Sequence, residues 1–72
     1  MEIKMFDVVK TLVATENMKA GSIGTVVEIW DKNGPYEIEF IKRDTGRTIA
    51  LLTMNREEFE RIDDGSEEGK TN

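Results

Sequence analysis

Three carboxylates are spaced so that they share one surface. Glu37 and Glu39 alternate with apolar residues in the segment Tyr-Glu-Ile-Glu-Phe, so both point to the same side of an extended chain. Glu28 lies in the preceding apolar segment, which we expect to form the adjacent strand. Paired carboxylates perform general acid–base chemistry in a pocket that raises the pKa of one of them. A chain of 72 residues has little volume for such a pocket, so we interpret the three glutamates as a solvated strand face, with Lys or Arg on neighbouring strands relieving their repulsion.

The residue types that most enzyme and metal sites need are missing. The chain has no histidine and no cysteine, which removes the commonest general base, a thiol nucleophile, thiolate metal ligands and disulfides. Asp31, Asn33 and Gly34 resemble the start of a calcium-binding loop, but the glycine comes two positions early and no glutamate follows at the twelfth position. We therefore predict no catalytic residue, no metal site and no cofactor, and conclude that the protein is not an enzyme.

Charge and hydropathy divide the chain into two parts. Residues 63–72 contain no apolar residue and carry −3 of the net charge of −5, so we predict a disordered acidic tail after a single domain over residues 1–62. The longest unbroken apolar run, residues 49–52, is far shorter than the roughly 20 residues of a membrane-spanning helix. The first residues do not resemble a signal peptide, so we expect a cytoplasmic protein with no membrane partner.

Apolar patterns predict five short strands. The alternation in residues 36–41 is the cleanest, with Tyr36, Ile38 and Phe40 facing inward. The run of apolar residues 49–52 predicts a strand that is buried on both faces and therefore lies in the centre of the sheet. The expected strands cover residues 6–13, 25–30, 36–41 and 48–53, and a brief last strand uses Phe59, Arg61 and Ile62.

Glycines mark the start of the second expected strand. Gly21 and Gly24 precede a β-branched run, and glycine reaches positive φ without steric cost, so we interpret both as part of a turn. A phosphate-binding loop would need a helix after the glycines instead. Regular alternation in the strand that follows places Val26, Glu28 and Trp30 on one face.

Turn signals separate the remaining strands and define the fold. Residues 31–35 and 44–47 are typical of hairpin turns, and residues 14–20 form the long first loop. Asn55 and the glutamates after it predict a single helical turn before the last strand; a full helix over residues 55–62 is the alternative. The expected fold is all-β, an SH3-like small barrel of about five short antiparallel strands with one short helical turn before the last strand. The other interpretation is a four-stranded sheet with one C-terminal helix.

Four segments resemble a family of short bacterial and archaeal proteins of unknown function. They are Phe-Asp-Val-Val at residues 6–9, Gly-Ser-Ile-Gly-Thr-Val-Val-Glu at 21–28, Tyr-Glu-Ile-Glu-Phe at 36–40 and Ala-Leu-Leu-Thr at 50–53. The resemblance covers residues 5–62 and implies an SH3-like barrel. Because members lie beside toxin-like genes, it also implies an antitoxin or immunity role. It identifies no active site, so no residue role follows from it.

Two further similarities give alternative functions. The glycine-led strand is similar to KOW-type barrels, which bind nucleic acid, and here Lys42, Arg43 and Arg47 would contact an anion. A nearly balanced domain lacks the positive field of such proteins, so nucleic acid is not the expected partner. The Gly-Thr-Val-Val segment is also similar to a small SH3-like subunit of the photosynthetic NADH-dehydrogenase-like complex, which implies a structural subunit of a larger assembly.

Trp30, Pro35 and Tyr36 flank one turn and are the candidate protein-binding residues. SH3-type domains bind proline-rich peptides in aromatic-lined grooves, and partly exposed tryptophan is enriched at interfaces. The alternative is that Trp30 closes the open end of the barrel. The sequence therefore predicts a non-enzymatic protein-interaction module with a protein partner.

Overall fold

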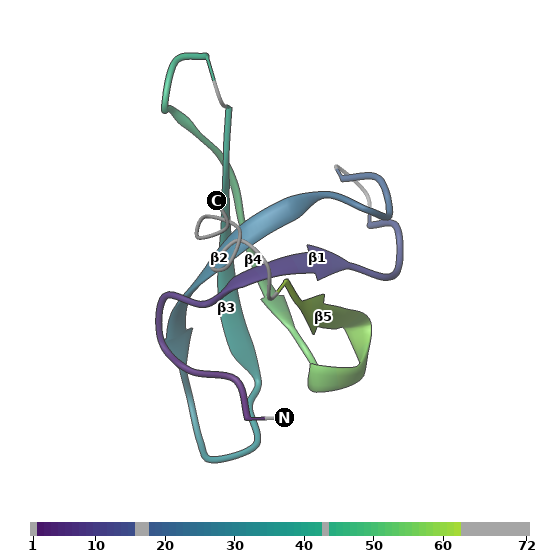
Figure 1. Cartoon of the computed structure of the whole chain (residues 1–72), viewed down its shortest axis with the longest axis vertical. Helices are drawn as coiled ribbons and strands as arrows, with labels where there is room; N and C mark the ends of the chain where they lie inside the picture. Colours follow the sequence, from purple (N-terminus) through teal and green to yellow (C-terminus); the bar gives the residue numbers. More distant parts are fainter. Residues whose placement is uncertain (1, 16–17, 43, 63–72) are drawn as a thin grey trace, which may run out of the picture.

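The computed structural model describes residues 2–15, 18–42 and 44–62, which form a five-stranded antiparallel sheet (Figure 1). The elements are β1 (Val8–Thr11), β2 (Ile23–Ile29), β3 (Tyr36–Ile41), β4 (Thr48–Met54), the 3₁₀ turn η1 (Arg56–Glu58) and β5 (Phe59–Arg61). The all-β class and the helical turn before the last strand are confirmed, and the alternative helix over residues 55–62 is wrong. The predicted tail lies outside the described residues. No helix in the described ranges could cross a membrane.

The strands lie in the order β4-β3-β2-β1-β5 in one open sheet. In Figure 1, β1 and β5 run across the direction of β3 and β4, and β2 curves from one direction to the other. The curve is accompanied by a bulge in β2 between Val26 and Glu28, and a second bulge interrupts the pairing of β3 with β4. Bulges bend a strand, so they help this short sheet to curl over its own core. Closure into an SH3-like barrel stays a prediction.

The core lies on the concave side of the curled sheet. As predicted, β3 turns Tyr36, Ile38 and Phe40 inward. The Tyr36 ring packs edge-on against Phe59 of β5, with 5.3 Å between ring centroids. The other buried apolar residues are Ile3, Val9, Val26 and Met54. The first and last strands thus share one core with the central hairpin.

Strand β1 is shorter than expected, because the chain turns at Phe6. Phe6 has a φ of 69°, in the left-handed region, and its side chain is 69% exposed. A turn closes there when the Asp7 amide donates to the Lys4 carbonyl and the Asp7 carboxylate accepts from the Lys4 amide. At the other end of the predicted strand, Leu12 and Val13 are exposed and lie beyond β1.

The two glycines before β2 have different roles. Gly21 has a φ of 91° and turns the chain, as predicted. Gly24 lies inside β2 and is buried, so assigning it to the turn was wrong. A Cβ at Gly24 would lie 2.6 Å from Ile38 Cγ2 and 2.9 Å from Phe40 Cε2. Gly24 is therefore needed for the close approach of β2 to the side chains of β3.

Strand β4 is at the edge of the sheet, so the prediction of a central position was wrong. Its neighbour in the sheet is β3 alone. Ala50 and Leu52 pack against the core, whereas Ile49 and Leu51 are 53% and 57% exposed. The apolar run thus combines an inward face with an outward face that lies in water.

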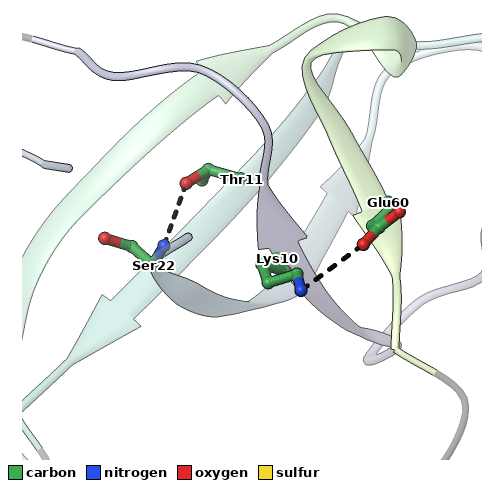
Figure 2. Close-up of polar contacts among 4 residues, drawn as sticks. All are labelled: Lys10, Thr11, Ser22 and Glu60. Atoms are coloured by element: carbon green, nitrogen blue, oxygen red, sulfur yellow. Dashed lines mark hydrogen bonds and ion pairs between the residues drawn. The ribbon is translucent and has the colours of Figure 1, made fainter. Parts of the chain in front are cut away.

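Thr11 is a buried polar residue that fixes the first loop to the sheet (Figure 2). Its Oγ1 accepts a hydrogen bond from the Ser22 amide at 3.1 Å and donates to the Lys19 carbonyl at 3.2 Å. Lys10, the preceding residue, points the other way and forms an ion pair with Glu60 at 3.6 Å. A satisfied buried hydroxyl therefore holds the two ends of the long loop together.

Candidate functional site

Trp30 follows β2 and lies over the outer face of the sheet, opposite the core. Its side chain is 60% exposed, and the indole Nε1 donates to Glu37 Oε2 at 3.4 Å. Its amide donates to the Pro35 carbonyl at 3.0 Å, which fixes the base of the turn between β2 and β3. An indole with this much surface in water does not close an end of the core. Trp30 is therefore available to a partner.

The structure separates the three predicted protein-binding residues. Pro35 is exposed in the turn, but Tyr36 is only 4% exposed because it is the first inward residue of β3. Trp30 and Tyr36 thus lie on opposite faces of the sheet and do not form an aromatic groove. Part of Tyr36 lines a hollow of about 470 Å³ together with Glu2, Ile3, Lys32, Asn33 and Arg56.

A bulge sets the position of Glu28. Regular alternation places Glu28 on the same face as Val26, as predicted, and Val26 is buried, but the bulge adds one residue to β2 between them. Glu28 becomes the direct partner of Glu37 on the outer face, and Ile29 turns inward opposite Tyr36. The bulge thus brings two carboxylates of like charge together beside Trp30.

Threonine hydroxyls, rather than Lys or Arg, contact the carboxylates of β3. Thr53 Oγ1 donates to Glu37 Oε2 at 2.7 Å, and Thr48 Oγ1 donates to Glu39 Oε2 at 2.7 Å. The ion pairs of the described residues lie elsewhere, between Lys10 and Glu60 and between Asp7 and Arg61. The predicted relief by cations across the strands is therefore wrong, and both glutamates keep their negative charge available to a ligand.

Exposed apolar side chains surround these carboxylates. Val8, Thr25, Glu39 and Leu51 form one row across β1, β2, β3 and β4. Ile23 and Ile41 are also exposed beside this row. We define the outer face by these residues together with Glu28, Trp30, Glu37 and Thr53. It combines apolar patches with three carboxylates that form no ion pair with the described Lys and Arg residues, a composition that suits an amphipathic protein partner.

The predicted anion-contacting residues lie apart from Trp30. Lys42 and Arg47 are exposed on the two sides of the turn between β3 and β4, where the Lys42 amide donates to the Arg47 carbonyl at 2.8 Å. Arg43 lies outside the described residues. In Figure 1 this turn and the turn after Trp30 are at opposite ends of the long axis. These basic residues and the outer-face carboxylates near Trp30 therefore do not form one site.

Within the described ranges, no group of three or more Asp or Glu side chains is arranged so that it could hold a metal ion. Thr48 and Thr53 were not predicted to belong to the site. Their side chains meet Glu39 and Glu37 only through the pairing of β4 with β3, for which the local sequence carries no signal.

Comparison with protein families identifies the domain. Residues 5–61 match the family described as "Domain of unknown function (DUF4926)". The chain belongs to this family. The resemblance drawn from four sequence segments is thereby confirmed, and a DUF4926 domain accounts for all five strands. No curated protein and no solved structure matches the chain. The family description names no activity, so the function has to be argued from the surface.

Proposed function

We propose that this DUF4926 domain is a non-enzymatic, cytoplasmic protein-interaction module that binds a protein partner through its outer face. The observation that carries the proposal is the position of Trp30, which is 60% exposed and lies beside Glu37 and its cross-strand partner Glu28. Neither glutamate has a Lys or Arg partner among the described residues.

This arrangement suits a cationic side chain of the partner. Lys or Arg is attracted to the face of an indole, and its hydrogen bonds to a carboxylate are stronger than neutral ones. Tryptophan is also enriched among the residues that dominate binding energy at interfaces. The partner therefore presents Lys or Arg to Glu28 and Glu37, with apolar residues beside it.

The antitoxin role implied by the family resemblance is one form of this proposal. A toxin that acts on nucleic acid carries a cationic site for phosphate, and the outer-face carboxylates would occupy that site. The alternative of a KOW-like nucleic-acid protein has less support, because the turn that carries Lys42 and Arg47 lies at the opposite end of the molecule from the turn after Trp30, and a nearly balanced domain lacks a strong positive field.

A second candidate is a small structural subunit of a larger complex. Exposed Ile23, Ile41, Ile49 and Leu51 favour it, because isolated soluble domains seldom expose so many large apolar side chains in one region. This candidate predicts a permanent partner and self-association of the purified chain.

The test is a pull-down from the source cell with tagged wild type and three variants, before and after nuclease treatment. We expect one stoichiometric protein with wild type, and loss of it with Trp30→Ala and Glu37→Gln. Lys32→Ala, in the same turn as Trp30, is the matched control and should capture the partner normally. Recovery of nucleic acid, or loss of the partner after nuclease, would contradict the proposal and favour the KOW-like alternative.

A further inference from the structure

The two edges of the sheet differ in length and chemistry. β5 has three residues and includes Glu60 and Arg61, which form ion pairs. β4 has seven residues, Thr-Ile-Ala-Leu-Leu-Thr-Met, with no charged residue and no proline. Short edges, charges and prolines are the features that prevent an edge strand from pairing with another chain. β4 has none of these three features; its bulge lies at the Thr48 end, and among the described residues its backbone is paired with β3 only.

The outward-pointing side chains of β4 could contact another strand added at its free edge. Leu51 and Ile49 are more than half exposed. Thr53 and Thr48 hold the carboxylates of Glu37 and Glu39, which come from the next strand inward. Neighbouring strands are about 4.8 Å apart, so a strand added to β4 lies about 10 Å from β3, and its Lys or Arg side chains reach these carboxylates.

We propose that β4 binds an extended segment of the protein partner as a sixth strand. The residue of the segment that lies opposite Leu51 is apolar. The residues two positions before and two positions after it point to the same face and are Lys or Arg, which pair with Glu37 and Glu39. The side chains between them are apolar, because they continue the inner face formed by Ala50 and Leu52. This proposal rests on the proposed function and specifies how the partner is recognised.

Charge complementarity favours a basic partner over a second copy of the chain. The protein has a net charge of −5, and β4 itself contains no Lys or Arg to offer to Glu37 or Glu39. Pairing two β4 strands would leave these carboxylates without cations in both copies. A basic, apolar segment would pair with the backbone groups at the open edge of β4 and would supply cations to Glu37 and Glu39.

The first experiment uses a synthetic peptide, acetyl-Thr-Thr-Lys-Val-Leu-Val-Lys-Thr-Thr-amide, titrated into ¹⁵N-labelled protein. Its lysines and leucine share one face of a strand. The matched control peptide has the same composition with the order Val-Lys-Leu-Lys-Val, which moves the lysines to the other face. We expect saturable binding of the first peptide with NMR shifts concentrated on β4, and at least about tenfold weaker binding of the control, which corresponds to about 1.4 kcal/mol.

Two variants test the position of the bound strand. Leu51→Lys should weaken peptide binding by about tenfold or more, because it adds a like charge at the centre of the edge. Ala20→Lys, which adds the same charge at an exposed position in the loop before β2 and outside the outer face, is the control and should bind within about threefold of wild type. Circular dichroism confirms that each variant is folded, and the comparison of the two peptides on wild type needs no variant.

Three results of the peptide titration would overturn the proposal: no saturable binding at about 1 mM peptide, equal affinity for the two peptides, or shifts confined to β1 and β2. The molar mass of the purified protein is a separate test. If it doubles with rising concentration in wild type but stays that of a monomer in Leu51→Lys, the edge of β4 binds a second copy of the chain instead. Capture of the same cellular partner by wild type and Leu51→Lys would refute docking on β4 while leaving the proposed function intact. If wild type captures no partner, the proposed function fails, and the peptide titration still decides whether β4 binds a strand.

Discussion

Glu28 and Glu37 are direct cross-strand partners on the outer face, with the indole of Trp30 hydrogen-bonded to the second of them. Like charges in directly opposite positions destabilise a sheet. The described residues contain no Lys or Arg that neutralises this pair. The pair is therefore a cost to the free domain that a cationic ligand would remove.

Replacing Glu28 with Lys should stabilise the isolated domain. The substitution converts a repulsive cross-strand pair into an attractive one, so the free energy of unfolding rises by about 0.2–1 kcal/mol in urea titrations. Capture of the partner should fall at the same time, because the cationic ligand loses one carboxylate. Glu60→Lys is the control: it breaks the ion pair with Lys10 and should not stabilise the protein. A Glu28→Lys protein that is less stable than wild type would contradict the reading of this pair.

Trp30 is the only tryptophan of the chain, so its fluorescence reports on the outer face directly. We expect acrylamide to quench it in the folded protein nearly as well as it quenches a free indole. Trp30→Ala should change the free energy of unfolding by less than about 0.5 kcal/mol, because the side chain lies outside the core. A shielded fluorophore, or a large loss of stability in this variant, would show that Trp30 has a structural role.

Gly24 should not tolerate a methyl group. Gly24→Ala places a Cβ within 3 Å of Ile38 and Phe40, and overpacking of this kind costs about 1–3 kcal/mol. The measurement is the midpoint of urea unfolding. Thr25→Ser, on the opposite side of the same strand, serves as the comparison and should change stability by about 0.5 kcal/mol or less. Equal effects of the two substitutions would contradict the close packing at Gly24.

Thr11 should stabilise the first loop through its hydroxyl. Thr11→Val keeps the shape of the side chain but removes both hydrogen bonds, so we expect a loss of about 1–2 kcal/mol and faster hydrogen exchange at the Ser22 amide. Thr11→Ser retains the hydroxyl and should keep the slow exchange. If the Ser22 amide exchanges at the same rate in Thr11→Val, the hydroxyl does not hold the loop.

The local sequence pattern predicted those strands and turns whose conformation is set by residues adjacent in the sequence. The alternation around Ile38 gave both the strand and its inward face, because one side of β3 meets the core and the other meets water. Gly21 and Gly46 were correctly assigned to turns, since both have positive φ. The helical turn after Asn55 was also predicted, and the Asn55 amide donates a hydrogen bond to the Glu58 carboxylate, which caps the turn.

Features set by strand order and bulges were not predictable in this way. An apolar run such as residues 49–52 is compatible with a central or an edge strand, and only the order of the sheet, set by long-range pairing, places β4 at the edge. The bulge after Val26 reverses the faces of Glu28 and Ile29, and no glycine marks it. Alternation correctly predicted that Tyr36 faces inward, but Tyr36 was also proposed as a binding residue beside Trp30; its register opposite Ile29 and Met54 places it in the core, on the other face from Trp30.

The unequal edges of the sheet also determine how large an assembly can become. A strand received at β4 adds to the sheet on one side, while the short, ion-paired β5 offers no comparable place on the other. Head-to-tail growth into filaments needs two complementary edges on each molecule, and this one has a single receptive edge. If β4 receives a strand as proposed, addition would stop at that strand, and the complex would have a defined stoichiometry.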